Sequence, residues 1–162
     1  MANSDRPAGF RPYGRIKSIN YGVAAAAIAK GDALKVDSDG KIAVGTAAGA
    51  LCGVAAAQAA SGATVMYYDD PTQLFIGQGD GSDIDAQTDF NLNCDLLATA
   101  YNSTYDMSRH EVDTSELNTT ATLPLKIIRI LNTPENALGA QVKVVFKINN
   151  HQYGSHTGTA GV

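Results

Sequence analysis

The chain has 162 residues, a formal net charge of −4 and 44% hydrophobic residues, which fits one globular domain that needs no metal or disulfide to bury a core. Alanine dominates the hydrophobic residues, and no apolar run approaches the roughly 18 residues that a membrane-spanning helix requires. The polar N-terminus up to Arg11 lacks the apolar segment of a secretory signal. We therefore expect a soluble protein, made in a cytoplasm, with no membrane partner.

Basic and acidic residues are separated along the chain. The first 20 residues carry four basic residues against Asp5 alone, whereas the segment from Asp69 to Glu116 has Arg109 as its single basic residue among eleven acidic ones. This separation favours electrostatic contacts between copies or with an acidic partner surface. Four dispersed basic residues are too few for a nucleic-acid footprint, so we expect no nucleic-acid partner.

The first 19 residues predict an extended arm. Pro7 and Pro12 remove backbone donors and favour extended geometry in the residues that precede them. Such an arm is suited to lying across a neighbouring subunit, and a disordered tail is the alternative. The alanine run that follows Tyr21 fits either a helix or a strand.

Residues 29–68 predict a compact β-unit of four short strands in meander order. Gly31–Asp37 and Lys41–Val44 alternate apolar and polar residues on either side of Ser38-Asp39-Gly40, which predicts a hairpin because glycine supplies the positive φ of a tight turn. Leu51–Ala57 and Ala63–Tyr68 predict the second pair of strands.

Residues 74–149 predict a second β-layer. Its strands are expected at Leu74–Ile76, Leu96–Tyr101, Leu123–Leu131 and Val142–Ile148. Gly77–Gly81 is expected to break the first of these, and one helical turn each is expected at Ser82–Gln87 and Ser115–Leu117, the latter inside a polar loop over 102–120. The predicted fold class is therefore mainly β: a short-stranded antiparallel meander or barrel-like domain over 20–150, an extended N-terminal arm, and a tail over 151–162 that only contacts would order.

Residues suited to chemistry are few and scattered. Cys52 and Cys94 lack metal-ligand or redox spacing, which predicts buried reduced thiols, with a disulfide as the alternative. Gly77–Gly81 lacks the Lys-Ser/Thr ending of a phosphate-binding loop. Clustered carboxylates suit calcium, but the spacing here is not that of an EF-hand, and solvated loop acids are the simpler interpretation. These carboxylates are Asp80, Asp83 and Asp85.

The three histidines are the candidates for a general base. His110 adjoins Glu111, which predicts a surface pair, whereas His151 and His156 lie in the flexible tail, a poor platform for a catalytic triad. The chain contains no Gly-x-Ser-x-Gly nucleophile elbow. We therefore expect no enzyme activity, no cofactor and no bound metal.

Three groups of segments together resemble the tailed-bacteriophage capsid decoration proteins, which are also called cement or minor coat proteins. They are the opening Pro7-Ala8-Gly9-Phe10-Arg11-Pro12; the hairpin Gly31-Asp32-Ala33-Leu34-Lys35-Val36 with Asp39-Gly40-Lys41 and then Gly53-Val54-Ala55; and the closing Lys147-Ile148-Asn149-Asn150-His151-Gln152 with Gly158-Thr159-Ala160-Gly161-Val162. The resemblance implies a β-domain that binds the outer surface of the major capsid protein lattice, stabilises the head without catalysis, and forms a homotrimer or, alternatively, a homodimer.

The residues expected to grip the capsid or a neighbouring subunit lie in the arm. Aromatic and arginine side chains are the usual anchors of interfaces, and the arm offers Phe10, Arg11, Pro12, Tyr13 and Arg15. The expected location is the outer capsid surface of a virion, after synthesis in the host bacterial cytoplasm. Two alternatives remain open: a minor coat or head-completion structural protein, and a surface carbohydrate-binding module. The stacking platforms of the latter would be Tyr67, Tyr68, Tyr101 or Tyr105.

Overall fold

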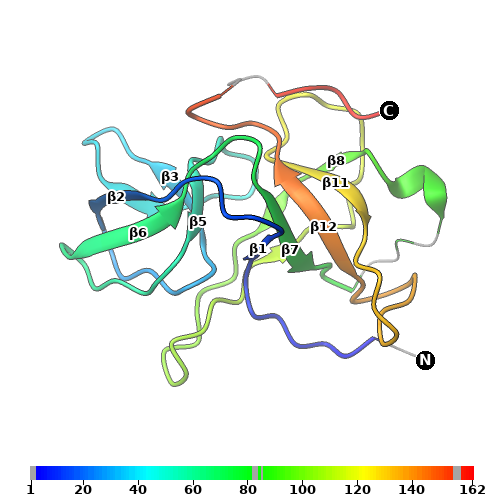
Figure 1. The fold of residues 1–162 in the computed structure, drawn as a ribbon, viewed down its shortest axis with the longest axis horizontal. Helices are drawn as coiled ribbons and strands as arrows, with labels where there is room; N and C mark the ends of the chain where they lie inside the picture. The colour runs from blue at the N-terminus through cyan, green and yellow to red at the C-terminus, as the bar shows by residue number, and fades with distance from the viewer. Residues whose placement is uncertain (1–2, 82–83, 85, 155–157) are drawn as a thin grey trace.

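Short antiparallel strands account for nearly all the regular structure of the computed structural model, which describes residues 3–81, 84, 86–154 and 158–162 (Figure 1). The fold is mainly β, as the sequence predicts. Two five-stranded sheets form the body, and a two-stranded ribbon joins them. In spatial order, sheet 1 consists of β2 (Asn20–Val23), β6 (Thr64–Tyr68), β5 (Gly53–Ala55), β3 (Ala33–Val36) and β4 (Ile42–Val44). Sheet 2 consists of β1 (Arg11–Tyr13), β7 (Leu74–Gln78), β12 (Lys143–Ile148), β11 (Leu125–Ile130) and β8 (Asn93–Cys94).

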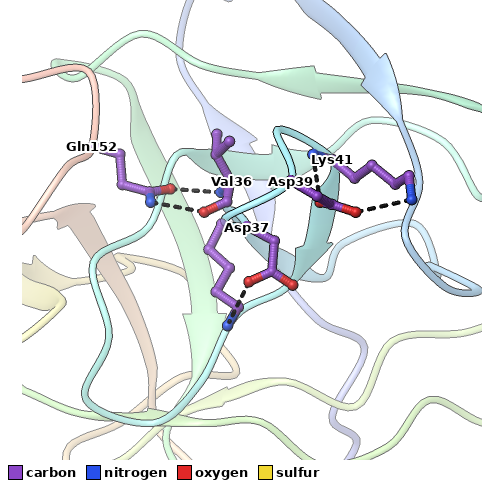
Figure 2. Close-up of polar contacts among 6 residues, drawn as sticks. Val36, Asp37, Asp39, Lys41 and Gln152 are labelled. Atoms are coloured by element: carbon purple, nitrogen blue, oxygen red, sulfur yellow. Dashed lines mark hydrogen bonds and ion pairs between the residues drawn. The ribbon is translucent and has the colours of Figure 1, made fainter.

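Sheet 1 curls until its two edges meet. A parallel bridge joins Ala24, just after β2, to Ile42 of β4, and the Ala25 amide donates to the Ile42 carbonyl at 2.8 Å. The predicted hairpin is present as β3 and β4, with Gly40 at φ +77° in its turn. The Asp39 carboxylate accepts the Lys41 amide across that turn at 3.1 Å (Figure 2). The result is a small barrel-like unit, as predicted. The four strands expected over 29–68 are present, but their meander order is wrong, because β3 pairs with both β4 and β5 whereas a meander would pair β4 with β5.

Sheet 2 is built around the β11–β12 hairpin and extends outward through β7. Gly77 and Gln78 belong to β7, so the prediction that the glycines break this strand at Gly77 is wrong. The physical reason is a tertiary contact: a Cβ atom on Gly77 would lie 2.7 Å from the Phe10 ring. Glycine is therefore needed in this strand for close packing rather than for a turn.

The connecting ribbon and the loops differ in part from the expected elements. The ribbon pairs β9 (Leu96–Leu97) with β10 (Glu111–Val112), so a strand lies inside the predicted loop over 102–120. A single 3-10 turn, η1, spans Gln87–Asp89; the predicted turn at Ser82–Gln87 lies partly outside the described residues. Ser115 and Glu116 form a turn, not a helix. Among the described residues, no helix has the length and hydrophobicity to cross a bilayer.

Two hydrophobic cores hold the fold together. The smaller lies inside sheet 1 and centres on Leu34, Val65 and Tyr67. The larger combines Leu51 and Val54 of the sheet 1 region with aromatic residues of sheet 2 such as Phe75 and Phe146. Because the larger core contains residues from both regions, sheet 1 and sheet 2 pack against each other rather than forming separate bodies.

The N-terminal segment folds back onto its own chain, which differs from an arm that lies across a neighbour. β1 pairs antiparallel with β7, with Arg11 opposite Ile76 and Tyr13 opposite Leu74. This pairing covers an edge of sheet 2 that would otherwise be open. Pro12 lies at the centre of β1 and has no amide hydrogen, a residue type suited to the outermost strand of a sheet.

Candidate interaction surface

An exposed apolar strip covers the outside of β2 and β6. We call this set of side chains the outer strip: Ile19, Tyr21, Val23 and Met66, with exposed fractions of 43%, 61%, 47% and 36%. Tyr21 lies directly opposite Met66 in the antiparallel pairing, and Val23 is two residues further along the same face of β2. In Figure 1, β2 and β6 lie together at the left end of the molecule.

The outer strip exists because both faces of this part of sheet 1 carry apolar side chains. Residues in a strand alternate between the two faces, and the intervening positions point into the barrel-like unit. Val65 and Tyr67 are buried there, and a Cβ atom at Gly22 would meet the Ile42 side chain. Val65 and Tyr67 therefore pack inside the barrel-like unit, whereas the side chains of the outer strip remain exposed. Exposed apolar surfaces of this kind often mark interaction sites.

An open hollow of about 400 Å³ lies beside the outer strip, since Ser18 and Asn20, the neighbours of Ile19, line it. Asn20, the first residue of β2, lines it together with Asp69, Asp70 and Tyr153. Thr72 donates its amide and its hydroxyl to the Asp70 carboxylate at 2.7 and 2.6 Å, and these hydrogen bonds lower the pKa of Asp70. An apolar centre with a charged rim at one end is the usual layout of a protein–protein interface.

The predicted anchor residues are divided between the core and the surface. Phe10 is only 3% exposed and packs edge-on against Phe146, with 4.7 Å between ring centroids. Its ring therefore stabilises its own chain in this structure. Pro12 and Tyr13 are half-buried, and the Arg129 guanidinium donates to the Tyr13 hydroxyl at 2.6 Å and lies 5.2 Å from its ring centroid.

Arg11 and Arg15 are exposed and available for contact. The structure therefore keeps Arg11 and Tyr13 together on the outer side of β1, while Phe10 faces inward. The outer strip was missed by the sequence prediction. The period-two pattern of Asn20-Tyr21-Gly22-Val23 is a strand signal that, together with the β-favouring residues of β6, would have located it.

His110 is buried and does not form the predicted surface pair with Glu111. Its Nδ1 accepts the Ala33 amide at 3.0 Å, and its Nε2 lies 3.6 Å from the Asp32 carboxylate. Burial lowers the pKa of His110, while Asp32 opposes that shift. Ser108 accepts the His110 amide through its hydroxyl. Since the acceptor nitrogen of the ring is occupied by backbone, this arrangement joins β3 to the segment before β10 rather than activating a nucleophile.

Of the remaining candidates for chemistry, the structure describes Asp80 and His151, and each has a hydrogen-bond partner. The Asp80 carboxylate accepts the Thr114 amide and hydroxyl at 3.1 and 2.8 Å, whereas Asp83, Asp85 and His156 are outside the described residues. His151 is buried, and its Nδ1 accepts the Tyr153 amide at 3.1 Å. Over the described part of the chain, no three His, Cys, Asp or Glu side chains are grouped closely enough to hold a metal ion.

The two thiols and the tyrosines can also be placed. Cys52 and Cys94 are free and buried, as predicted; burial raises the pKa of Cys52 to about 12 and also raises that of Cys94. Tyr67 is 2% exposed and donates to or accepts from the Tyr153 hydroxyl at 2.9 Å. Its proposed role as a sugar-stacking platform is therefore wrong, whereas Tyr105 is 73% exposed.

Gln78 fastens the start of the N-terminal segment to the body. Its Oε1 accepts the Arg6 amide at 3.1 Å, and its Nε2 donates to the Asp5 and Glu111 carboxylates at 3.1 and 3.3 Å. Burial, with repulsion from Asp5 and Asp80, raises the pKa of Glu111 to about 7. The attachment of this segment therefore includes a carboxyl group that titrates near neutral pH.

Comparison with known proteins adds no family assignment. No protein-family model matches the sequence, and no curated protein matches it.

Proposed function

We propose that the chain is a structural protein of a virus particle, a capsid decoration or cement protein that acts through protein–protein contacts. The observation that carries the proposal is the outer strip, an exposed apolar face on two paired antiparallel strands. The order of the segments that resemble tailed-phage decoration proteins supports the same role. The partners are the major capsid protein and further copies of the chain, with a homotrimer favoured over a homodimer.

The physical logic of such a protein is multivalency. A single subunit contact is weak, but an oligomer that touches several capsid subunits binds tightly because the later contacts form at high effective concentration. Binding only to the assembled shell then stabilises that shell by mass action. In this proposal the outer strip supports the oligomer, and the exposed Arg11 and Arg15 contact the capsid.

The test is co-sedimentation of the purified protein with undecorated heads assembled from the major capsid protein of the same virus. Tyr21→Asp is expected to reduce both the native mass and the binding to heads, the latter at least about tenfold. Replacing Arg11 and Arg15 with alanine is expected to weaken head binding and leave the native mass unchanged.

Tyr105→Asp is the matched control, since Tyr105 is another exposed tyrosine, in the turn that the Asn102–Met107 bridge closes. If the wild-type protein does not co-sediment with heads at micromolar concentration, the decoration role is wrong. Copy number in intact particles separates decoration from the alternative role as a minor coat or head-completion protein, because only decoration requires many copies on the shell.

A further inference from the structure

Residues 3–13, which we call the plug, dock on the rest of the chain. We call the site that receives the Phe10 side chain the socket; it is formed by Gly31, Gly77, His110 and Phe146. The Phe10 amide donates to the Gly31 carbonyl at 2.8 Å, and its ring packs against Phe146 and, at 6.2 Å between centroids, against His110. Gly77 leaves room for that ring, since a Cβ atom there would lie 2.7 Å from it. All socket residues lie between 31 and 146, so the plug and the socket are separate parts of the sequence.

The connector between the plug and sheet 1, residues 14–19, is weakly held. It makes no backbone–backbone hydrogen bond with another described residue. Its fastenings use side chains: Gln73 accepts the Lys17 amide at 3.1 Å, and the Lys17 ammonium donates to Thr72. Fully extended, six residues span roughly 20 Å. A straightened connector would therefore carry the plug to an adjacent molecule.

The apolar surface of the molecule continues along this connector. Ile16 and Ile19 are 46% and 43% exposed, and Ile19 leads directly into Tyr21 and Val23 of the outer strip. A plug taken from a second copy makes the same contacts in the socket as the chain's own plug, so the exchange itself changes little in free energy. Apolar side chains of the connector and the outer strip that meet across the new contact add favourable burial.

We propose that copies of the chain exchange their N-terminal segments, so that residues 3–13 of each copy occupy the socket of a neighbour. β1 of one copy then pairs with β7 of the next, and Phe10 fills the socket of that next copy. The occupant of the outer strip is accordingly a second copy of this chain. This inference rests on the oligomeric part of the proposed function and specifies how the subunits are joined.

The test is a disulfide trap across the β1–β7 pair. Arg11 and Ile76 are register partners on the outer side of sheet 2, and Cα atoms paired in an antiparallel ladder are close enough for a disulfide. The double variant Arg11→Cys/Ile76→Cys is oxidised, free thiols are alkylated before unfolding, and the product is run on a non-reducing denaturing gel. Lys35→Cys/Ala43→Cys, register partners within the β3–β4 hairpin, is the control that can cross-link only within a chain.

Exchange predicts covalent oligomers for the Arg11–Ile76 pair and monomers for the control. It also predicts a mixed disulfide after the two single variants, Arg11→Cys and Ile76→Cys, are unfolded and refolded together. Oligomers in solution whose Arg11–Ile76 cross-links are all intramolecular overturn the exchange and leave the proposed function standing. A native mass of one chain overturns both the exchange and the oligomer. The absence of any cross-link in either arrangement also overturns the exchange, because it requires Arg11 beside Ile76 of another copy.

Discussion

Gln152 pairs with Val36 through its side-chain amide in the way that a neighbouring strand pairs through its backbone. The Val36 amide donates to Oε1 of Gln152 at 2.7 Å, and Nε2 of Gln152 donates to the Val36 carbonyl at 3.1 Å (Figure 2). One side chain thus satisfies both backbone groups at the end of β3. It also fastens the segment after β12 to sheet 1.

Replacing Gln152 with glutamate should weaken this joint, since a carboxylate accepts hydrogen bonds but donates none. The Val36 carbonyl would lose its donor, which is expected to lower the free energy of unfolding by about 1–3 kcal/mol. Urea denaturation followed by circular dichroism measures the change. Gln58→Glu serves as the control, because Gln58 is exposed. Equal stability of the two variants would contradict the proposed role of Gln152.

Phe10→Ala should be the most damaging single change in the N-terminal segment. Phe10 is nearly fully buried against Phe146, and truncation of a buried phenylalanine typically lowers the free energy of unfolding by about 3–5 kcal/mol. Gly77→Ala is expected to act in the same direction, since the added methyl group meets the Phe10 ring. Thermal unfolding of both variants checks this, and melting temperatures equal to that of the wild type would show that the socket is not occupied by Phe10.

Both thiols should be unreactive until the protein unfolds. Cys52 and Cys94 are buried, and burial raises the pKa of each, so little of the reactive thiolate is present at neutral pH. Ellman's reagent at pH 8 is expected to label neither cysteine in the native protein and both in denaturant. Rapid labelling of a native thiol would place that cysteine in a segment that opens readily.

Stability should fall as the pH rises through the range set by Glu111. Its carboxyl group faces Asp5, Asp80, Arg109 and Gln78, and its pKa is raised to about 7 from an ordinary value of 4.5. The folded state therefore binds a proton more tightly than the unfolded state between these two values. Glu111 therefore contributes to the free energy of unfolding in full below about pH 4.5. This contribution is lost as the pH rises through about 7.

Glu111→Gln is expected to remove this dependence and to raise the melting temperature at pH 8. Melting temperatures measured from pH 5 to pH 8 check it, and the exposed Glu135→Gln is the control. A wild-type profile that Glu111→Gln leaves unchanged would rule out Glu111 as the group responsible.

Local patterns in the sequence predicted local structure well. The β3–β4 hairpin follows from alternation around Asp39-Gly40, and the buried thiols follow from cysteine spacing. The two strands that form the β11–β12 hairpin and the mainly β class were also predicted. In each case the determining interactions lie within a few residues, or depend only on whether a residue is apolar.

Long-range contacts could not be predicted in this way. Nothing near Phe10 indicates that its partners are Gly77 and Phe146, and Gly77 looks like a strand breaker until the Phe10 ring is placed beside it. His110 has the neighbours of a surface residue in the sequence, yet the fold brings it to Asp32 and Ala33. The alternation in β2 marks a strand, but it does not show that the apolar positions Tyr21 and Val23 face outward rather than into the core.

The position of Phe10 near the start of the chain has a consequence for the order of events during synthesis. The residues that complete its socket include Phe146, so Phe10 leaves the ribosome well before its socket can be complete. During that interval it is free to meet other nascent chains on the same messenger. The proposed exchange would therefore begin during translation, when newly made copies are most concentrated.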